Sequence, residues 1–84
     1  MRFKALVLVT PKPGISDPEG ATIEDAARHL GFANVSRVTA GRAFVVEGES
    51  GGIAEARAEI DTMGERLLSN PVIQEYSVLE LEEI

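Results

Sequence analysis

The sequence predicts an α+β fold of two layers in the order strand, helix, strand, helix, strand. Two segments have the apolar spacing of amphipathic helices, and three have the alternation typical of strands. Glycine and proline mark the junctions between them. This order is a variant of the ferredoxin-like split βαβ plan. With 84 residues and no break in composition, the chain is expected to form a single domain over residues 1–84.

The segment between the two predicted helices, Val35–Glu47, is predicted to be one long central strand. From Arg42 onward its residues alternate with the period of two that a pleated strand imposes. Gly41 interrupts the pattern, and we interpret it as a bend, with a short hairpin at residues 39–41 as the less favoured alternative. Such a strand outruns the sheet of a small domain, so we expect dimerisation to complete the sheet.

The first and the last predicted strands each carry apolar residues on both faces. In residues 3–10, Phe3, Ala5, Val7 and Val9 alternate with Leu6 and Leu8, and in the last strand, Val72 to Leu81, Tyr76 and Val78 alternate with Leu79 and Leu81. One layer of helices covers only one face of an antiparallel sheet. We therefore expect the second face to be covered by another copy of the chain.

The two helices have well-marked ends. Asp17 and Pro18 are typical of an N-cap and first helical position, and Gly31 is typical of a left-handed C-terminal residue. The second helix is predicted over Ile53–Ser69, with Ser50 as its cap and Asn70-Pro71 as its stop. Gly64 in its interior costs roughly 1 kcal/mol relative to alanine, which predicts a close approach by another backbone.

Composition excludes several classes of function. The net charge of −6 disfavours nucleic acids and anionic membranes as partners. Cysteine is absent, which removes disulfides and thiolate chemistry and fits a reducing compartment. Without a segment of signal-peptide or membrane-spanning character, the expected location is the cytoplasm.

Catalytic groups are scarce, and we predict no catalytic, cofactor or metal site in this chain. His29, the single histidine, is expected to be a surface partner of a helix C-terminus. Arg37 and Arg42 flank the predicted bend, where they could meet a phosphate-bearing ligand or an acidic partner. The alternative is that both arginines pair with local carboxylates.

Four motifs together resemble the PurS family, the small subunit of phosphoribosylformylglycinamidine (FGAM) synthase. The resemblance spans nearly the whole chain, and its most specific part is the last motif. The motifs are Asp17-Pro18-Glu19-Gly20, Leu30-Gly31-Phe32, Val38-Thr39-Ala40-Gly41-Arg42 and Leu67-Leu68-Ser69-Asn70-Pro71-Val72-Ile73-Gln74-Glu75-Tyr76. The chain departs from the family pattern at Thr10–Gly14, which is richer in proline, and at Arg42, where lysine is common.

The resemblance implies a non-catalytic subunit of a complex in purine biosynthesis. It implies a homodimer that bridges a glutaminase subunit to a larger synthetase subunit and assists the transfer of ammonia between them. The partner subunits would use the glutamine and the ATP, and the product would be the amidine of formylglycinamide ribonucleotide. On this hypothesis two groups of residues make the contacts. Self-association would use Leu6, Leu8, Leu79 and Leu81, and the larger subunits would meet Arg37, Gly41, Arg42, Asn70 and Pro71.

A second class of function fits the same composition. Small ferredoxin-like modules also dimerise through their sheets and bind metabolites as regulatory sensors. The alternative function is therefore a small metabolite-binding regulatory module.

Overall fold

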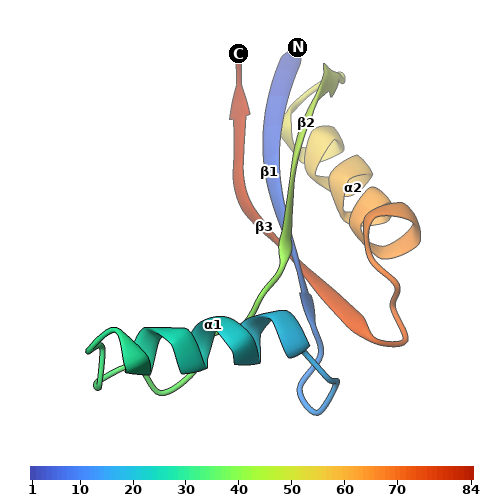
Figure 1. Ribbon diagram of the computed structural model, residues 1–84. Helices are drawn as coiled ribbons and strands as arrows, with labels where there is room; N and C mark the ends of the chain where they lie inside the picture. The colour runs from blue at the N-terminus through green and yellow to red at the C-terminus, as the bar shows by residue number, and fades with distance from the viewer.

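A computed structural model describes all 84 residues and has the predicted α+β order. One antiparallel sheet carries the strands in the order β2-β1-β3, and helix α2 lies on one side of it (Figure 1). The elements are β1 (Arg2–Pro11), α1 (Pro18–His29), β2 (Arg42–Glu49), α2 (Ile53–Met63), a π-helical turn η1 (Gly64–Leu68) and β3 (Gln74–Glu83).

The strand between the helices is shorter than predicted and is not central. It begins at Arg42 rather than Val35, and the middle of the sheet is β1. Residues 35–41 run alongside α1 instead, where side chains of that helix hold the backbone N–H groups of Val38 and Ala40. The alternative hairpin at residues 39–41 is also absent, because β2 pairs only with β1. After α1 the chain therefore runs back along the helix and enters β2, an edge strand, without forming a hairpin.

The core lies between the sheet and α2. Phe3, Ala5 and Val7 of β1 pack against Ala56 and Ile60 of α2, and all five are buried. Full burial of a side chain such as Ile60 stabilises the fold by roughly 2–3 kcal/mol. The predicted alternation of β1 is confirmed, because every second residue from Phe3 to Val9 faces this core.

A β-bulge in β3 changes which of its residues face the core. Leu6 pairs with Glu80 and Val7 pairs with Val78, so Leu79 is an extra residue without a partner. Leu81 then opposes Ala5 and packs against the core, whereas Leu79 is exposed. The prediction that Leu79 and Leu81 share one face is wrong, because a bulge reverses the alternation.

Helix α1 begins and ends as predicted but stands apart from the sheet. The side chain of Asp17 accepts a hydrogen bond from the Gly20 N–H, and Gly31 has a φ of 97°. The Phe32 N–H bonds to the Ala27 carbonyl at 3.0 Å, which closes a Schellman motif. In Figure 1, α1 extends sideways from the end of the sheet, on the other side from α2. The molecule therefore measures 50 × 27 × 14 Å.

The ends of the second helix differ from the predictions. Its N-cap is Gly52, and the Ser50 hydroxyl donates to the Gly52 carbonyl rather than capping the helix. Asn70 does not adopt a left-handed conformation, since no residue other than glycine has a positive φ. Its side-chain oxygen instead accepts from the Val72 N–H at 3.1 Å and shapes the turn into β3.

Gly64 is approached by a side chain and not by a backbone. A β-carbon at this position would lie 2.6 Å from the ring of Tyr76, whose hydroxyl donates to Asp61 at 3.2 Å. The missing side chain thus lets a β3 aromatic ring lie flat against the helix. The prediction of a close contact at Gly64 is confirmed, but the contacting group is the Tyr76 ring and not a backbone.

We expect Gly64→Ala to destabilise the fold despite the better helix propensity of alanine. Overpacking costs about 1–3 kcal/mol, whereas the propensity gain is about 1 kcal/mol. Urea unfolding followed by circular dichroism measures the difference. In a Tyr76→Ala background the clash is gone, so the same substitution should raise the unfolding free energy. Destabilisation in both backgrounds would contradict this explanation.

Candidate interaction surfaces

We call residues 17–41 the arm: α1 and the segment that returns from it to β2. Backbone groups of the return segment bond to side chains of the helix. Asp17 accepts from the Ala40 N–H at 2.9 Å, and Glu24 accepts from the Val38 N–H at 2.9 Å. Arg28 donates to the Ser36 carbonyl at 3.2 Å. These bonds join the two halves of the arm along its length.

The same bonds lower the pKa of both carboxyl groups. For Asp17 the main cause is the Ala40 N–H, followed by the Gly20 N–H, and Arg37 adds a favourable charge. For Glu24 the main cause is the Val38 N–H, followed by Arg28. Hydrogen bonds from N–H groups stabilise the ionised carboxylate. The arm is therefore held by charged acceptors at neutral pH.

Gly20 permits the tight packing at the root of the arm. A β-carbon there would lie 2.4 Å from the Val38 carbonyl oxygen. Its place in the Asp17-Pro18-Glu19-Gly20 motif thus has a structural reason, which the sequence alone did not show.

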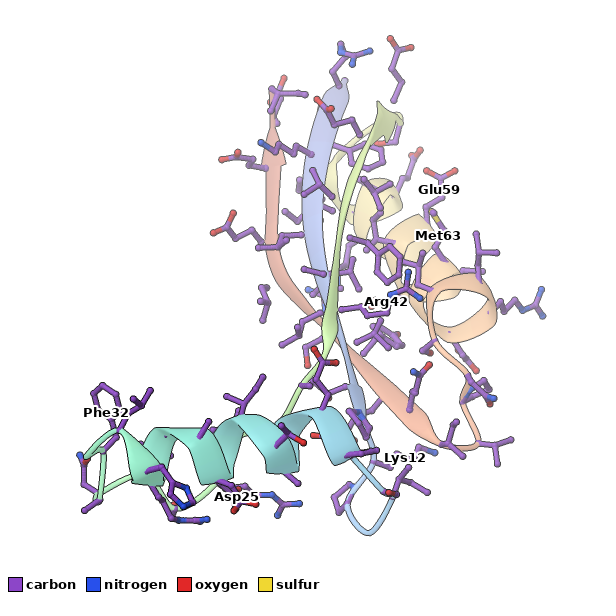
Figure 2. The ribbon with its side chains drawn as sticks, in the orientation of Figure 1. Lys12, Asp25, Phe32, Arg42, Glu59 and Met63 are labelled. Carbon is purple, nitrogen blue, oxygen red and sulfur yellow. The ribbon has the colours of Figure 1, made fainter.

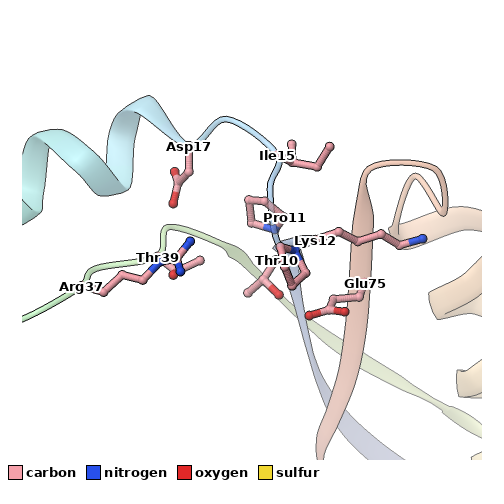
Figure 3. Close-up of a pocket in the computed structure, with 9 residues that line it drawn as sticks. Thr10, Pro11, Lys12, Ile15, Asp17, Arg37, Thr39 and Glu75 are labelled. Atoms are coloured by element: carbon pink, nitrogen blue, oxygen red, sulfur yellow. The ribbon is translucent and has the colours of Figure 1, made fainter.

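A polar cavity of about 350 Å³ opens between the arm and the end of the sheet (Figure 3). Its charged lining residues are Lys12, Asp17, Arg37 and Glu75. The two basic and two acidic groups balance, so the cavity has no net charge to select an anion. It has no nucleophile paired with a base, and no three His, Asp or Glu side chains of the chain converge as a metal site requires.

The structure separates the two arginines that the sequence placed together. Arg37 lines the polar cavity, whereas Arg42 lies over the ring of Phe44 at 5.4 Å from its centroid. The Arg42 side chain is on the α2 side of the sheet, because Arg42 opposes Val9, which is buried on that side. The two residues do not form one binding site. Neither has an ion pair within the chain, contrary to the alternative of pairing with local carboxylates.

The predicted contact residues Asn70 and Pro71 form an exposed corner just before β3. Lys12 connects the corner to the end of β1, since its ammonium group donates to the Pro71 carbonyl and its N–H donates to Ile73 at 2.9 Å. Arg37 and this corner therefore lie at the same end of the molecule, on the two sides of Lys12. The structural role of Lys12 was missed, because its partners are backbone carbonyls distant in sequence.

The residues predicted for self-association are only partly brought together. Leu6 and Leu8 lie half-buried on the sheet face that α2 leaves open, next to the exposed Val45. Leu79, at the bulge, is exposed. Leu81 is on the opposite face and belongs to the core.

The arm also exposes large apolar side chains, which the sheet does not cover. Ile23, Leu30 and Phe32 are 47%, 77% and 56% exposed, and Figure 2 shows Phe32 at the tip, far from the sheet. Large exposed apolar side chains on a projecting element are candidates for contact with a partner.

These features define a class of protein: a small α+β interaction subunit with an open sheet and a projecting arm. No helix is both long and apolar enough to cross a membrane. The family model PurS, described as phosphoribosylformylglycinamidine (FGAM) synthase, matches residues 4–83. The chain belongs to the PurS family.

Relatives and solved structures agree with this assignment. A PurS subunit of phosphoribosylformylglycinamidine synthase from Archaeoglobus fulgidus is 42% identical over 73 residues, covering 87% of this chain and 91% of the relative. Thermus thermophilus PurS superposes with a TM-score of 0.90 at 32% identity, covering 100% of this chain and 99% of that one. A chain of the PurLQS structure from Thermotoga maritima has a TM-score of 0.81 at 30% identity, with coverage of 100% and 99%.

We expect the bonds between the two halves of the arm to weaken in acid. A carboxyl group whose pKa is lowered by folding stabilises the native state fully above its ordinary pKa of about 4. This contribution falls as the pH drops below that value and is lost below the folded-state pKa. The amide proton shift of Ala40, followed by NMR, should therefore titrate with a midpoint below about 4.

Asp17→Asn is the matched control for this titration. It keeps an acceptor oxygen but removes the charge, so the Ala40 transition should disappear while the Val38 transition persists through Glu24. A midpoint at or above the ordinary carboxyl value would contradict the role given to these hydrogen bonds.

Proposed function

We propose that this chain is the small, non-catalytic subunit of an FGAM synthase complex. In that role it bridges the glutaminase and the larger synthetase subunit and assists the transfer of ammonia between them. The observation that supports this most is the match over residues 4–83 to the PurS family. A chain similar at a TM-score of 0.81 belongs to the PurLQS structure, which supports assembly with other subunits.

The geometry supports a bridging role better than a catalytic one. The charged groups around the polar cavity balance one another, and large apolar side chains are exposed on the sheet and on the arm. The contribution of such a subunit is to hold two active sites together, so that ammonia is not lost to water. The reaction at those sites uses ATP and glutamine bound by the partner subunits, and this chain needs no cofactor. The expected location of this complex is the cytoplasm.

Self-association is part of the proposal. The face of Leu6, Leu8 and Val45 has no covering helix, and neither edge of the sheet is paired. An open face and two open edges favour a second copy as a partner. Arg37, at the polar cavity, and the exposed Asn70-Pro71 corner are then available to the larger subunits.

Reconstitution with the glutaminase and synthetase subunits of the same genome tests the function. With glutamine as nitrogen donor, leaving this chain out should reduce turnover at least about tenfold, or 1.4 kcal/mol in barrier. With ammonium salts as donor, turnover should persist, because no transfer between subunits is needed. Equal turnover from glutamine with and without the chain would refute the proposal.

Charge reversal at Arg37 tests the surface given to the larger subunits. Arg37→Glu should weaken co-elution with them on size-exclusion chromatography, because the exposed guanidinium has no ion-pair partner within the chain. Arg66→Glu, on the exposed side of η1, is the matched control and should co-elute normally. Unchanged assembly of both variants would place the contact elsewhere.

A metabolite-binding regulatory module is the second candidate, and the polar cavity of about 350 Å³ is the observation that favours it. Ligand binding to the folded state raises thermal stability by an amount that grows with the ratio of free ligand to its dissociation constant. If the chain is a bridging subunit, amino acids and nucleotides at millimolar concentration should leave its melting temperature unchanged. A clear rise with one of them would favour the sensor.

A further inference from the structure

We propose that the open face of the sheet, the side opposite α2, is a docking site for a basic amphipathic helix of a partner subunit. The inference rests on the proposed function, because the partner is one of the two larger subunits of that complex. It assigns the open face to a different chain rather than to a second copy. Self-association then needs only the edges of the sheet.

The centre of the open face is apolar. The odd-numbered residues of β1 from Phe3 to Val9 are buried on the helix side, so its even-numbered residues lie on the open face. Leu6 lies next to Val45 of β2, and Leu8 lies next to Ala43. These four side chains are adjacent and form one apolar patch.

The bulge in β3 extends this patch to the third strand. Val78 and Leu81 both pack against the core, so the two residues between them, Leu79 and Glu80, lie on the open face. Leu79 is 54% exposed and Val45 is 59% exposed. The apolar patch therefore reaches across all three strands.

Unpaired carboxylates surround the patch. On the β3 side lie Glu75, Glu80 and Glu82, and on the β2 side Glu47 opposes Lys4. None of these four carboxylates has an ion pair within the chain. An apolar centre with a polar rim is the usual arrangement of a protein interface. The free carboxylates are complementary to a partner that carries lysine or arginine beside its apolar residues.

The same charges argue against a second copy on this face. The open face carries five acidic side chains and only two basic ones, so two copies placed face to face would oppose like charges. The net charge of −6 for the whole chain acts in the same direction. The acidic residues are Glu47, Glu49, Glu75, Glu80 and Glu82, and the basic ones are Arg2 and Lys4.

The dimensions of the patch favour a helix over a facing sheet. The two outer strands are about 10 Å apart, close to the diameter of a helix. Along the strands the patch covers residues 6–8 of β1, a rise of about 7 Å, whereas a facing sheet packs apolar residues along most of each strand. Basic residues at positions i and i+4 of a helix are about 6 Å apart. That spacing is close to the separation of about 7 Å between Glu80 and Glu82.

Charge reversal on the open face tests the docking site. Glu80→Lys should weaken binding of the larger subunits at least about tenfold in titration calorimetry. Binding of the unmodified chain should weaken with added salt, because salt screens exposed charges. Glu59→Lys makes the same change on the exposed side of α2 (Figure 2), where Glu59 has no ion pair, and should bind normally. Equal binding by the two variants would overturn the inference.

Truncation of an exposed leucine tests the apolar centre. Leu79→Ala should lower the affinity at least about fivefold, as loss of a buried interface side chain does. Leu67→Ala is the matched control, because Leu67 is 72% exposed on η1, away from the open face. Both variants should keep the circular dichroism spectrum and the sedimentation behaviour of the unmodified chain. A Leu79→Ala variant that binds at full affinity would overturn the docking site.

Photo-crosslinking identifies the occupant. With p-benzoylphenylalanine in place of Leu79, the reconstituted complex should link this chain to a helical segment of a larger subunit that has lysine or arginine beside an apolar stripe, identified by mass spectrometry. A link to another copy of this chain, a link to an acidic segment or no link in an assembled complex would overturn the inference and leave the proposed function intact. Larger subunits that fail to bind the unmodified chain would refute both.

Discussion

The architecture depends on the capture of two backbone N–H groups by two carboxylates. Asp17 and Glu24 bind the N–H groups of Ala40 and Val38, and this prevents residues 35–41 from folding back on β2. A charged acceptor makes a stronger bond to a peptide N–H than a neutral one does. Because the segment is fixed to α1, the chain runs straight into β2, and both the open sheet edge and the projecting arm follow from that.

Much of this fold could be predicted from the sequence, because it depends on local rules. The cap at Asp17, the left-handed Gly31 and the core alternation of β1 were each read from neighbouring residues and are confirmed. The long strand was misjudged for a different reason. Strand propensity favours an extended conformation for residues 35–41, but propensity cannot show that their hydrogen bonds go to side chains of α1 and its N-cap rather than to a neighbouring strand.

The candidate contact surfaces were harder to predict because they depend on contacts between distant residues. The bulge at Leu79 has no glycine or proline to mark it, and it moves Leu81 into the core. The separation of Arg37 from Arg42 follows from the arm geometry, and the role of Lys12 follows from two backbone carbonyls some sixty residues away. The family motifs name segments of the chain, and only the structure shows which of their side chains meet.

The hydrogen bonds of the arm explain how α1 stays folded although its apolar side chains are exposed. A projecting helix of 12 residues with exposed Ile23 and Leu30 is marginal by itself, since isolated helices of that length are barely stable in water. The carboxylate bonds to the return segment hold the arm in one conformation, which a partner would meet in the proposed assembly. Less ordering entropy is then lost on association, so more of the apolar contact energy contributes to binding. The small core and the open arm therefore serve the same end, a subunit that becomes complete in its assembly.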